Sequence, residues 1–242
     1  RQESREFMIE GVRFIEEAVS SGINIKYCLC SDYLDGDRVD SLLKTLEDKG
    51  IKLYKVEDKL FMDICDTESP QGILAVVEKV DYDLDKVVKD SSFLILIDRI
   101  QDPGNLGVLI RTAWAFGAKL CLLTPGTVDR YNPKAVRATM GGIFHLETTV
   151  AAPEAIMTWA AENGVALFAG DPRATVSLYE NVFPRKASII VGNEGSGLSG
   201  AWKVSHLVKY LSIPLPGQAE SLNVSTAAAI ILYEAVRQRL LG

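Results

Sequence analysis

From residue 93 onward, short apolar runs alternate with longer segments of helical periodicity, and this alternation constrains the fold more than any other feature of the chain. The run FLILI at 93–97 is continuously apolar, as expected of a strand buried on both faces. We predict further strands at 119–124, 165–169, 188–191 and 211–213, and helices at 106–116, 133–140, 153–163, 198–205 and 222–241. This order predicts a parallel sheet covered by helices on both faces, with ligands bound at the carboxyl ends of the strands.

The first 80 residues predict a separate, smaller α/β unit. Strands are expected at 25–30, 51–56 and 72–77, and helices at 11–21, at 58–65 and around the apolar positions 39–46, ending at Gly50. Residues 80–92, VDYDLDKVVKDSS, separate the two halves in composition. We therefore expect a first domain at 1–80, a linker at 81–92 and a second domain at 93–242. The first domain contains no catalytic constellation and is interpreted as a binding module.

Charge is distributed unevenly along the 242 residues, whose net charge is -6. Residues 1–90 contain 13 Lys+Arg and 21 Asp+Glu, whereas residues 91–242 contain 13 and 11. The acidity therefore belongs to the first half, and the second half can approach a polyanion without strong repulsion. A solvated acidic surface is the commoner reason for an excess of carboxylates.

Several classes of protein are excluded by simple features. No apolar run reaches the length of a membrane span, and the opening RQESREF is too polar for a signal peptide, so a cytoplasmic protein without membrane contact is expected. The four cysteines form no CxxC pair, which argues against a structural zinc site and for buried, reduced thiols.

Polar loops follow three of the predicted strands. The first, DRIQDPGNLG at 98–107, forms a tight turn and opens a helix, which Asn105 is suited to cap. Arg111 then lies in the second turn of an otherwise apolar helix. Its guanidinium either extends to solvent, as an ordinary surface residue would, or is kept there for a functional role.

The second and third loops are rich in glycine and proline. VGNEGSGL at 191–198 lacks the Lys-Ser/Thr of a P-loop and the glycine spacing of a dinucleotide fingerprint, and it has Glu194 at its centre. IPLPGQAESLNVS at 213–225 precedes the long final helix, which Ser221 is suited to cap. Each loop alone is compatible with a plain turn.

Taken together, the three loops contain no catalytic triad, no paired catalytic carboxylates and no metal cluster. His145 and His206 lie outside all three loops. Hydrolysis by a triad or by a metal is therefore not expected. These residues remain compatible with a different reaction class, in which the protein positions two bound reactants and a group passes from one to the other.

The three loops closely resemble, in order and spacing, the signature motifs of the SpoU (TrmH-type) family of S-adenosylmethionine-dependent RNA 2′-O-ribose methyltransferases, a branch of the SPOUT class. The matching segments are DRIQDPGNLGVLIRTAWAFGA, IIVGNEGSGLS and LSIPLPGQAESLNVSTAAAIILYEAVRQR. The segment from FMIEGVRFIEEAV to SPQGILAVVEKV resembles the family's substrate-binding domain, which has a ribosomal-protein-like α/β fold. The resemblance implies a Rossmann-like parallel sheet with a C-terminal deep trefoil knot. It further implies a homodimer packed through the knotted domain and an RNA substrate, with ribosomal RNA favoured over transfer RNA.

The resemblance also implies the site residues, with S-adenosylmethionine as cofactor and no metal. The expected catalytic residues are Arg111, Asn105, Glu194, Ser221 and Asn223. The expected cofactor-binding residues are Gly192, Ile213, Leu222, Thr124 and Gly170. Arg111 is expected to orient the ribose hydroxyl, because a guanidinium stays protonated and makes a poor base. Trp114 and Thr139 depart from the residues common in the family, and neither departure removes a catalytic group.

Three other functions stay open at this point. A transfer RNA methyltransferase would carry the same motifs. A non-catalytic RNA-binding protein of this fold would not need all five polar positions. A nicotinamide-dependent oxidoreductase would need the GxGxxG that is missing here. The sequence does not identify the nucleotide that is methylated.

Overall fold

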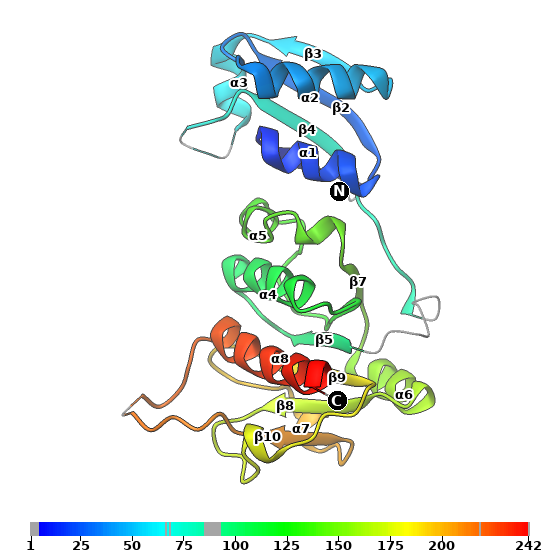
Figure 1. Cartoon of the computed structure of the whole chain (residues 1–242), viewed down its shortest axis with the longest axis vertical. Helices are drawn as coiled ribbons and strands as arrows, with labels where there is room; N and C mark the ends of the chain where they lie inside the picture. Colours follow the sequence, from blue (N-terminus) through cyan, green and yellow to red (C-terminus); the bar gives the residue numbers. More distant parts are fainter. Residues whose placement is uncertain (1–4, 66, 68, 85–92, 218, 242) are drawn as a thin grey trace. The chain divides into compact units, whose positions relative to one another are not determined.

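A computed structural model describes residues 5–65, 67, 69–84, 93–217 and 219–241. The chain divides into two compact units, Arg1–Val80 and Asp81–Gly242, which are treated separately below (Figure 1).

The first unit is a four-stranded sheet in the order β1-β4-β2-β3. Its strands are β1 (Glu6–Glu10), β2 (Ile25–Ser31), β3 (Lys52–Val56) and β4 (Ile73–Glu78), and its helices are α1 (Val12–Ser21), α2 (Asp37–Asp48) and α3 (Asp58–Ile64). Strand β4 is antiparallel to both neighbours, and β2 is parallel to β3. The predicted elements are confirmed to within a few residues. Strand β1 was missed because only Phe7 and Ile9 of its five residues are buried.

The second unit is a six-stranded sheet in the order β10-β8-β9-β5-β6-β7, and every pairing is parallel. The strands are β5 (Phe93–Asp98), β6 (Leu120–Leu123), β7 (Glu147–Val150), β8 (Ala166–Gly170), β9 (Ala187–Gly192) and β10 (Val208–Leu211). The α-helices are α4 (Pro103–Ala115), α5 (Pro133–Ala138), α6 (Pro153–Asn163), α7 (Gly200–Lys203) and α8 (Val224–Leu241). Short 3-10 helices in the described residues of this unit include η2 (Gly142–Phe144) and η3 (Leu178–Glu180). The α/β class with a parallel sheet is therefore confirmed.

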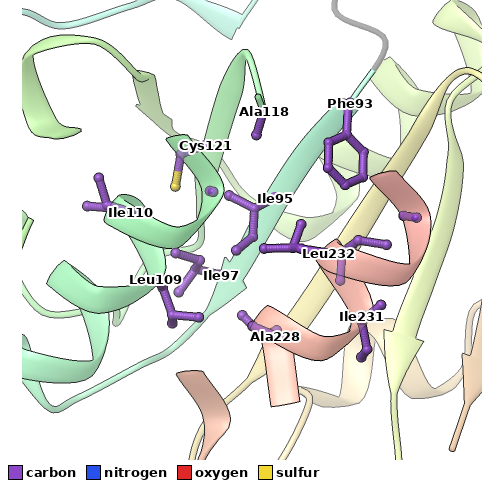
Figure 2. Close-up of a cluster of buried hydrophobic side chains, with 14 of the residues drawn as sticks. Phe93, Ile95, Ile97, Leu109, Ile110, Ala118, Cys121, Ala228, Ile231 and Leu232 are labelled. Carbon is purple, nitrogen blue, oxygen red and sulfur yellow. The ribbon is translucent and has the colours of Figure 1, made fainter. Parts of the chain in front are cut away.

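Two apolar layers cover the two faces of this sheet. On one face, Ile95 and Ile97 of β5 pack between Leu109 of α4 and Leu232 of α8 (Figure 2). On the other face, Leu94 and Leu96 belong to a cluster that α6 and α7 cover. Because both faces of β5 are buried, the strand is continuously apolar, as its sequence predicts.

Several predicted boundaries in the second unit were wrong. The strand expected at 211–213 is Val208–Leu211, and the helix expected at 198–205 is only Gly200–Lys203. Strand β7 was missed because its sequence, ETTV, has a single aliphatic residue. Helix α4 begins at Pro103, three residues before the predicted start. Its N-cap is Asp102, whose carboxylate accepts a hydrogen bond from the Asn105 N–H, so the expectation that Asn105 caps the helix was wrong.

The start of the predicted linker packs within the second unit. The Arg130 guanidinium donates to Asp81 at 2.7 Å, the Thr149 hydroxyl donates to the Tyr82 carbonyl, and Leu84 contacts the cluster beneath α6. Residues 85–92 of that prediction lie outside the described part of the chain. Among the helices that the structure describes, none is long and apolar enough to cross a membrane.

Candidate active site

The three polar loops emerge where the strand order of the second unit changes direction. Strands β6 and β7 lie on one side of β5, whereas β8, β9 and β10 lie on the other. Asp98, at the end of β5, pairs in register with Gly192, at the end of β9. In open parallel sheets this switch point is where ligands bind, and the sequence predicted a site at the same edge.

A chain of hydrogen bonds links the three loops. The Asn105 side-chain amide donates to Glu194 at 2.9 Å, and the Asn105 oxygen accepts from the Asn223 amide at 3.1 Å. The Ser225 hydroxyl donates to the Asn105 carbonyl at 3.3 Å. Three of the predicted catalytic residues, Asn105, Glu194 and Asn223, are thus brought together. They come from positions 89 and 118 residues apart in sequence.

The buried carboxylate of Asp98 holds together the chain segments on which the site is built. Its side chain is fully buried, and it accepts hydrogen bonds from the Ser199 N–H at 2.6 Å and from the Thr124 hydroxyl at 2.8 Å. The Arg99 guanidinium lies 3.6 Å from the same carboxylate. Asp98 therefore ties β5 to the end of β6 and to the loop after β9. Sequence analysis did not single it out, although a carboxylate that directly follows a buried strand was the available signal.

Asn193 gives the glycine-rich loop its shape, and sequence analysis missed this residue as well. Its side-chain oxygen accepts from the Gly195 and Ser196 N–H groups, and its amide donates to the Arg99 carbonyl at 3.0 Å. The backbones of Asn193 and Gly197 also exchange two hydrogen bonds. The side chain of Asn193 thus acts as a brace within the loop.

Any residue other than glycine at position 192 would displace this loop. A Cβ at Gly192 would lie 2.6 Å from the carbonyl carbon of Gly197, well inside contact distance. Arg99 has a φ of 56°, a left-handed conformation that is unfavourable for a residue with a side chain. Its N–H donates to both the Thr124 and the Thr127 hydroxyls at 3.1 Å, which holds that conformation in place. Such locally strained backbone concentrates at functional sites.

The third loop leads into α8 with a different cap from the one predicted. The Asn223 side chain accepts from the Ser225 N–H at 2.9 Å, so Asn223 caps the helix and the expectation for Ser221 was wrong. Ser221 is exposed in the loop before it. Leu222 and Ile213 are half-buried, and Ile213 packs against the apolar cluster beneath α4 and α8.

The remaining predicted cofactor residues lie at the ends of two other strands. Gly170 ends β8 and is exposed, and a Cβ there would meet the Ile231 side chain of α8 at 3.0 Å. Thr124 directly follows β6 and is buried. Its hydroxyl is already bonded to Asp98 and Arg99, so its side chain positions the strand ends.

Arg111 lies apart from the other predicted catalytic residues. It is six residues beyond Asn105 on α4, about 9 Å along the helix axis and about a third of a turn around it. Its side chain is exposed, and within the described residues it forms no hydrogen bond or ion pair. Among those same residues, no group of three or more His, Cys, Asp and Glu side chains could hold a metal ion.

Comparisons with known proteins match both units. The family model of the SpoU rRNA methylase family matches residues 92–233, and the model of an MRM3-like substrate binding domain matches residues 1–75. The chain is 36% identical over 256 residues to the 23S rRNA (uridine(2479)-2′-O)-methyltransferase of Streptomyces viridochromogenes, covering 100% of this chain and 86% of that protein. It is 37% identical over 238 residues to the 23S rRNA (guanosine(2553)-2′-O)-methyltransferase RlmP of Bacillus subtilis, covering 96% and 89%.

Solved structures agree with the sequence relatives. The SpoU methyltransferase AviRb from Streptomyces viridochromogenes, in complex with the cofactor AdoMet, superimposes with a TM-score of 0.88 at 34% identity. That match covers 100% of this chain and 94% of AviRb. An AdoMet-bound rRNA methyltransferase from Sinorhizobium meliloti gives a TM-score of 0.87 at 29% identity, with 100% and 90% covered.

Proposed function

The chain belongs to the SpoU rRNA methylase family, and from this membership we propose that it transfers a methyl group from S-adenosylmethionine (AdoMet) to a ribose 2′-oxygen of 23S rRNA. The observation that carries the proposal is the hydrogen-bonded chain of Glu194, Asn105 and Asn223 across three loops at the switch point of the sheet. No nucleophile is required of the protein, because both reacting groups belong to the ligands.

The residues at the strand ends fit AdoMet. Gly170 at the end of β8 is exposed and Gly192 at the end of the neighbouring strand β9 is half-buried, so backbone is accessible at both strand ends, beside the loop braced by Asn193. Ile213 and Leu222 supply apolar surface beside them. Bound AdoMet supplies an electrophilic methyl group on a sulfonium, which becomes a neutral thioether when the carbon–sulfur bond breaks.

Within the protein, positioning and charge provide the catalysis. The ribose 2′-hydroxyl must lose its proton to solvent as its oxygen bonds to the methyl carbon. A protonated guanidinium cannot accept that proton, so Arg111 acts by orienting the hydroxyl and stabilising the charge that develops on its oxygen. Asn105, fixed on both sides by Glu194 and Asn223, orients the ribose, and Ser221 offers its exposed hydroxyl from the loop that precedes Asn223.

A homodimer reconciles the position of Arg111 with this role. Exposed apolar side chains lie on both helices beside the site: Val108 on α4, and Ile230 and Tyr233 on α8. We propose that these faces pack against a second copy, and that Arg111 of one copy then reaches the Asn105–Glu194–Asn223 cluster of the other. A two-fold symmetric dimer would contain two such sites.

The C-terminal segment is proposed to form the trefoil knot. After β10, the Ser212 N–H donates to the Val176 carbonyl at 2.9 Å and the Ser212 carbonyl accepts from the Leu178 N–H at 2.8 Å. Helix α8 then returns over the centre of the sheet beside α4 (Figure 1). These contacts support the proposal, because the C-terminal segment passes beside the loop that contains Val176 and Leu178 before α8 packs on the sheet.

The first unit, residues 1–80, is proposed to bind the RNA and to favour ribosomal over transfer RNA. The match of residues 1–75 to a substrate-binding model supports this role. With the bacterial 23S rRNA methyltransferases among its relatives as support, we propose that the protein works in the cytoplasm.

Mapping of 2′-O-methylated riboses in a strain that lacks the gene tests the proposal. We expect one 23S rRNA position to lose its methyl group and to regain it when the wild-type gene, but not an Asn223→Ala gene, is restored. Loss of a methyl group from transfer RNA instead, or an unchanged map, would contradict the assignment.

A further inference from the structure

An exposed pair of stacked aromatic rings lies beside Arg111. The rings of Trp114 and His145 are 4.7 Å apart at their centroids and only 5° from parallel. Trp114 is 37% exposed, whereas the other two tryptophans, Trp159 and Trp202, are buried. His145 is exposed as well. Neither ring takes part in the hydrogen-bond network described for the site.

The fold fixes this pair in position relative to Arg111. Trp114 lies three residues after Arg111, so both side chains project from the same face of α4. His145 directly follows η2, which packs against that face: a Cβ at Gly142 would lie 3.4 Å from both the Arg111 Cα and the Trp114 ring. The stacked pair and the guanidinium therefore share one rigid support.

The surrounding charge suits a polyanion. Residues 103–145 contain five Lys or Arg residues and a single acidic residue, Asp129, although the whole chain carries a net charge of -6. Arg111, Lys134 and Arg137 are exposed in this segment, and Lys134 also pairs with Asp102, which directly precedes the segment, at 3.1 Å. A planar aromatic surface among cations is the arrangement that binds single-stranded nucleic acid, because every base presents a π-face.

We propose that a nucleobase of the RNA substrate stacks on the Trp114–His145 pair, while Arg111 contacts the ribose or phosphate next to it. This proposal rests on the proposed function and deepens it. Stacking on aromatic rings tolerates every base, so the platform holds the target strand in position and leaves the choice of nucleotide to other contacts. A second copy of the chain is the competing occupant of this surface.

Steady-state methyl transfer to a 23S rRNA transcript tests the platform. Trp114→Leu should raise the KM for the transcript about tenfold, the scale of one lost stacking contact. Trp114→Phe should stay near the wild-type value, because it keeps an aromatic face. The Kd for AdoMet should be unchanged in both. Tyr179→Leu, which removes an aromatic side chain that is 71% exposed on η3, is the matched control and should leave the KM for the transcript unchanged.

Two results would overturn the platform. One is a wild-type KM for the transcript in Trp114→Leu. The other is a Trp114→Leu protein that sediments as a monomer at a concentration where the wild type is a dimer, because the surface would then be a contact between copies.

Fluorescence separates this proposal from the proposed function. The same transcript should quench tryptophan emission of the wild type, and the quenching should vanish in Trp114→Phe, whose remaining tryptophans are buried. Quenching without any methyl transfer would reject 23S rRNA methylation and leave the platform standing. A transcript that leaves the emission unchanged, or quenches both proteins equally, would overturn the platform.

Discussion

Asp98 is a single carboxylate that joins three chain segments, so the geometry of the site depends on it. Asp98→Asn removes one acceptor oxygen and points an amide at a hydrogen-bond donor, either the Ser199 N–H or the Thr124 hydroxyl. Leaving buried partners of a charged group unsatisfied costs about 3 kcal/mol. We expect a lower free energy of unfolding in urea and weaker AdoMet binding by calorimetry. Unchanged AdoMet affinity in a folded Asp98→Asn protein would show that the carboxylate serves stability alone.

Arg111 should separate chemistry from cofactor binding. Arg111→Ala should leave the Kd for AdoMet within a few-fold and lower single-turnover methyl transfer about a hundredfold, the scale of one lost charge-stabilising group. Arg111→Lys should rescue little, because lysine lacks the planar fork. Asn223→Ala should weaken both steps, since Asn223 also orients Asn105. Near-normal transfer by Arg111→Ala would remove Arg111 from the mechanism.

Among individual residues, the sequence predicted the members of the polar cluster but not Asp98 and Asn193, which hold the surrounding loops in place. Asn105, Glu194 and Asn223 were predicted from the resemblance of their three motifs to those of the SpoU family, and each motif follows a strand of the parallel sheet at the same edge. Asp98 and Asn193 bind only to other parts of the protein, and no local pattern distinguishes such internal partners from ordinary turn residues. The distance of Arg111 from the cluster follows from the helical phase, which the motif resemblance alone does not convey.

Asp102 caps the N-terminus of helix α4, and this cap makes the stability of the helix depend on pH. The Asn105 N–H and then Lys134 hold the pKa of the Asp102 carboxyl below its ordinary value. The ionised form therefore stabilises the folded state above the unfolded pKa of about 3.9, and this contribution disappears as the pH falls through the folded pKa. We expect Asp102→Ala to lower the Tm at pH 7, with a difference from wild type that shrinks below pH 4. A Tm difference that is the same at pH 7 and at pH 3 would contradict this explanation.

Elements were predictable where burial dominates their sequence. The apolar run of β5 was identified because both of its faces are buried, and the long helix α8 was identified because it packs on one of the two apolar layers. Strands β1 and β7 were not, since β1 has a glutamate at each end and β7 begins with a glutamate and two threonines. The cap of α4 was misplaced because Asp102 and Asn105 are both good caps, and the turn geometry decides between them.

For the whole molecule, the proposed dimer predicts complementation between two inactive variants. If Arg111 acts on the site of the other copy, a heterodimer of Arg111→Ala and Asn223→Ala contains one intact site. Equal amounts, unfolded and refolded together, should recover about one quarter of wild-type methyl transfer through random pairing in two-fold dimers. The separately refolded proteins, mixed afterwards, are the control. No recovery would mean that both residues serve one site within a single chain.

If this chain methylates ribose in 23S rRNA as proposed, the methylated product resists alkali, and this chemical stability can be measured. A 23S rRNA transcript is incubated with the protein and methyl-labelled AdoMet and is then hydrolysed with alkali. A methylated 2′-oxygen cannot attack the neighbouring phosphate, so the label should appear in an alkali-resistant dinucleotide, and Asn223→Ala should give far less of it. Label in mononucleotides would mean that a base is methylated, and no label would mean that the transcript is not a substrate; either result would contradict the account.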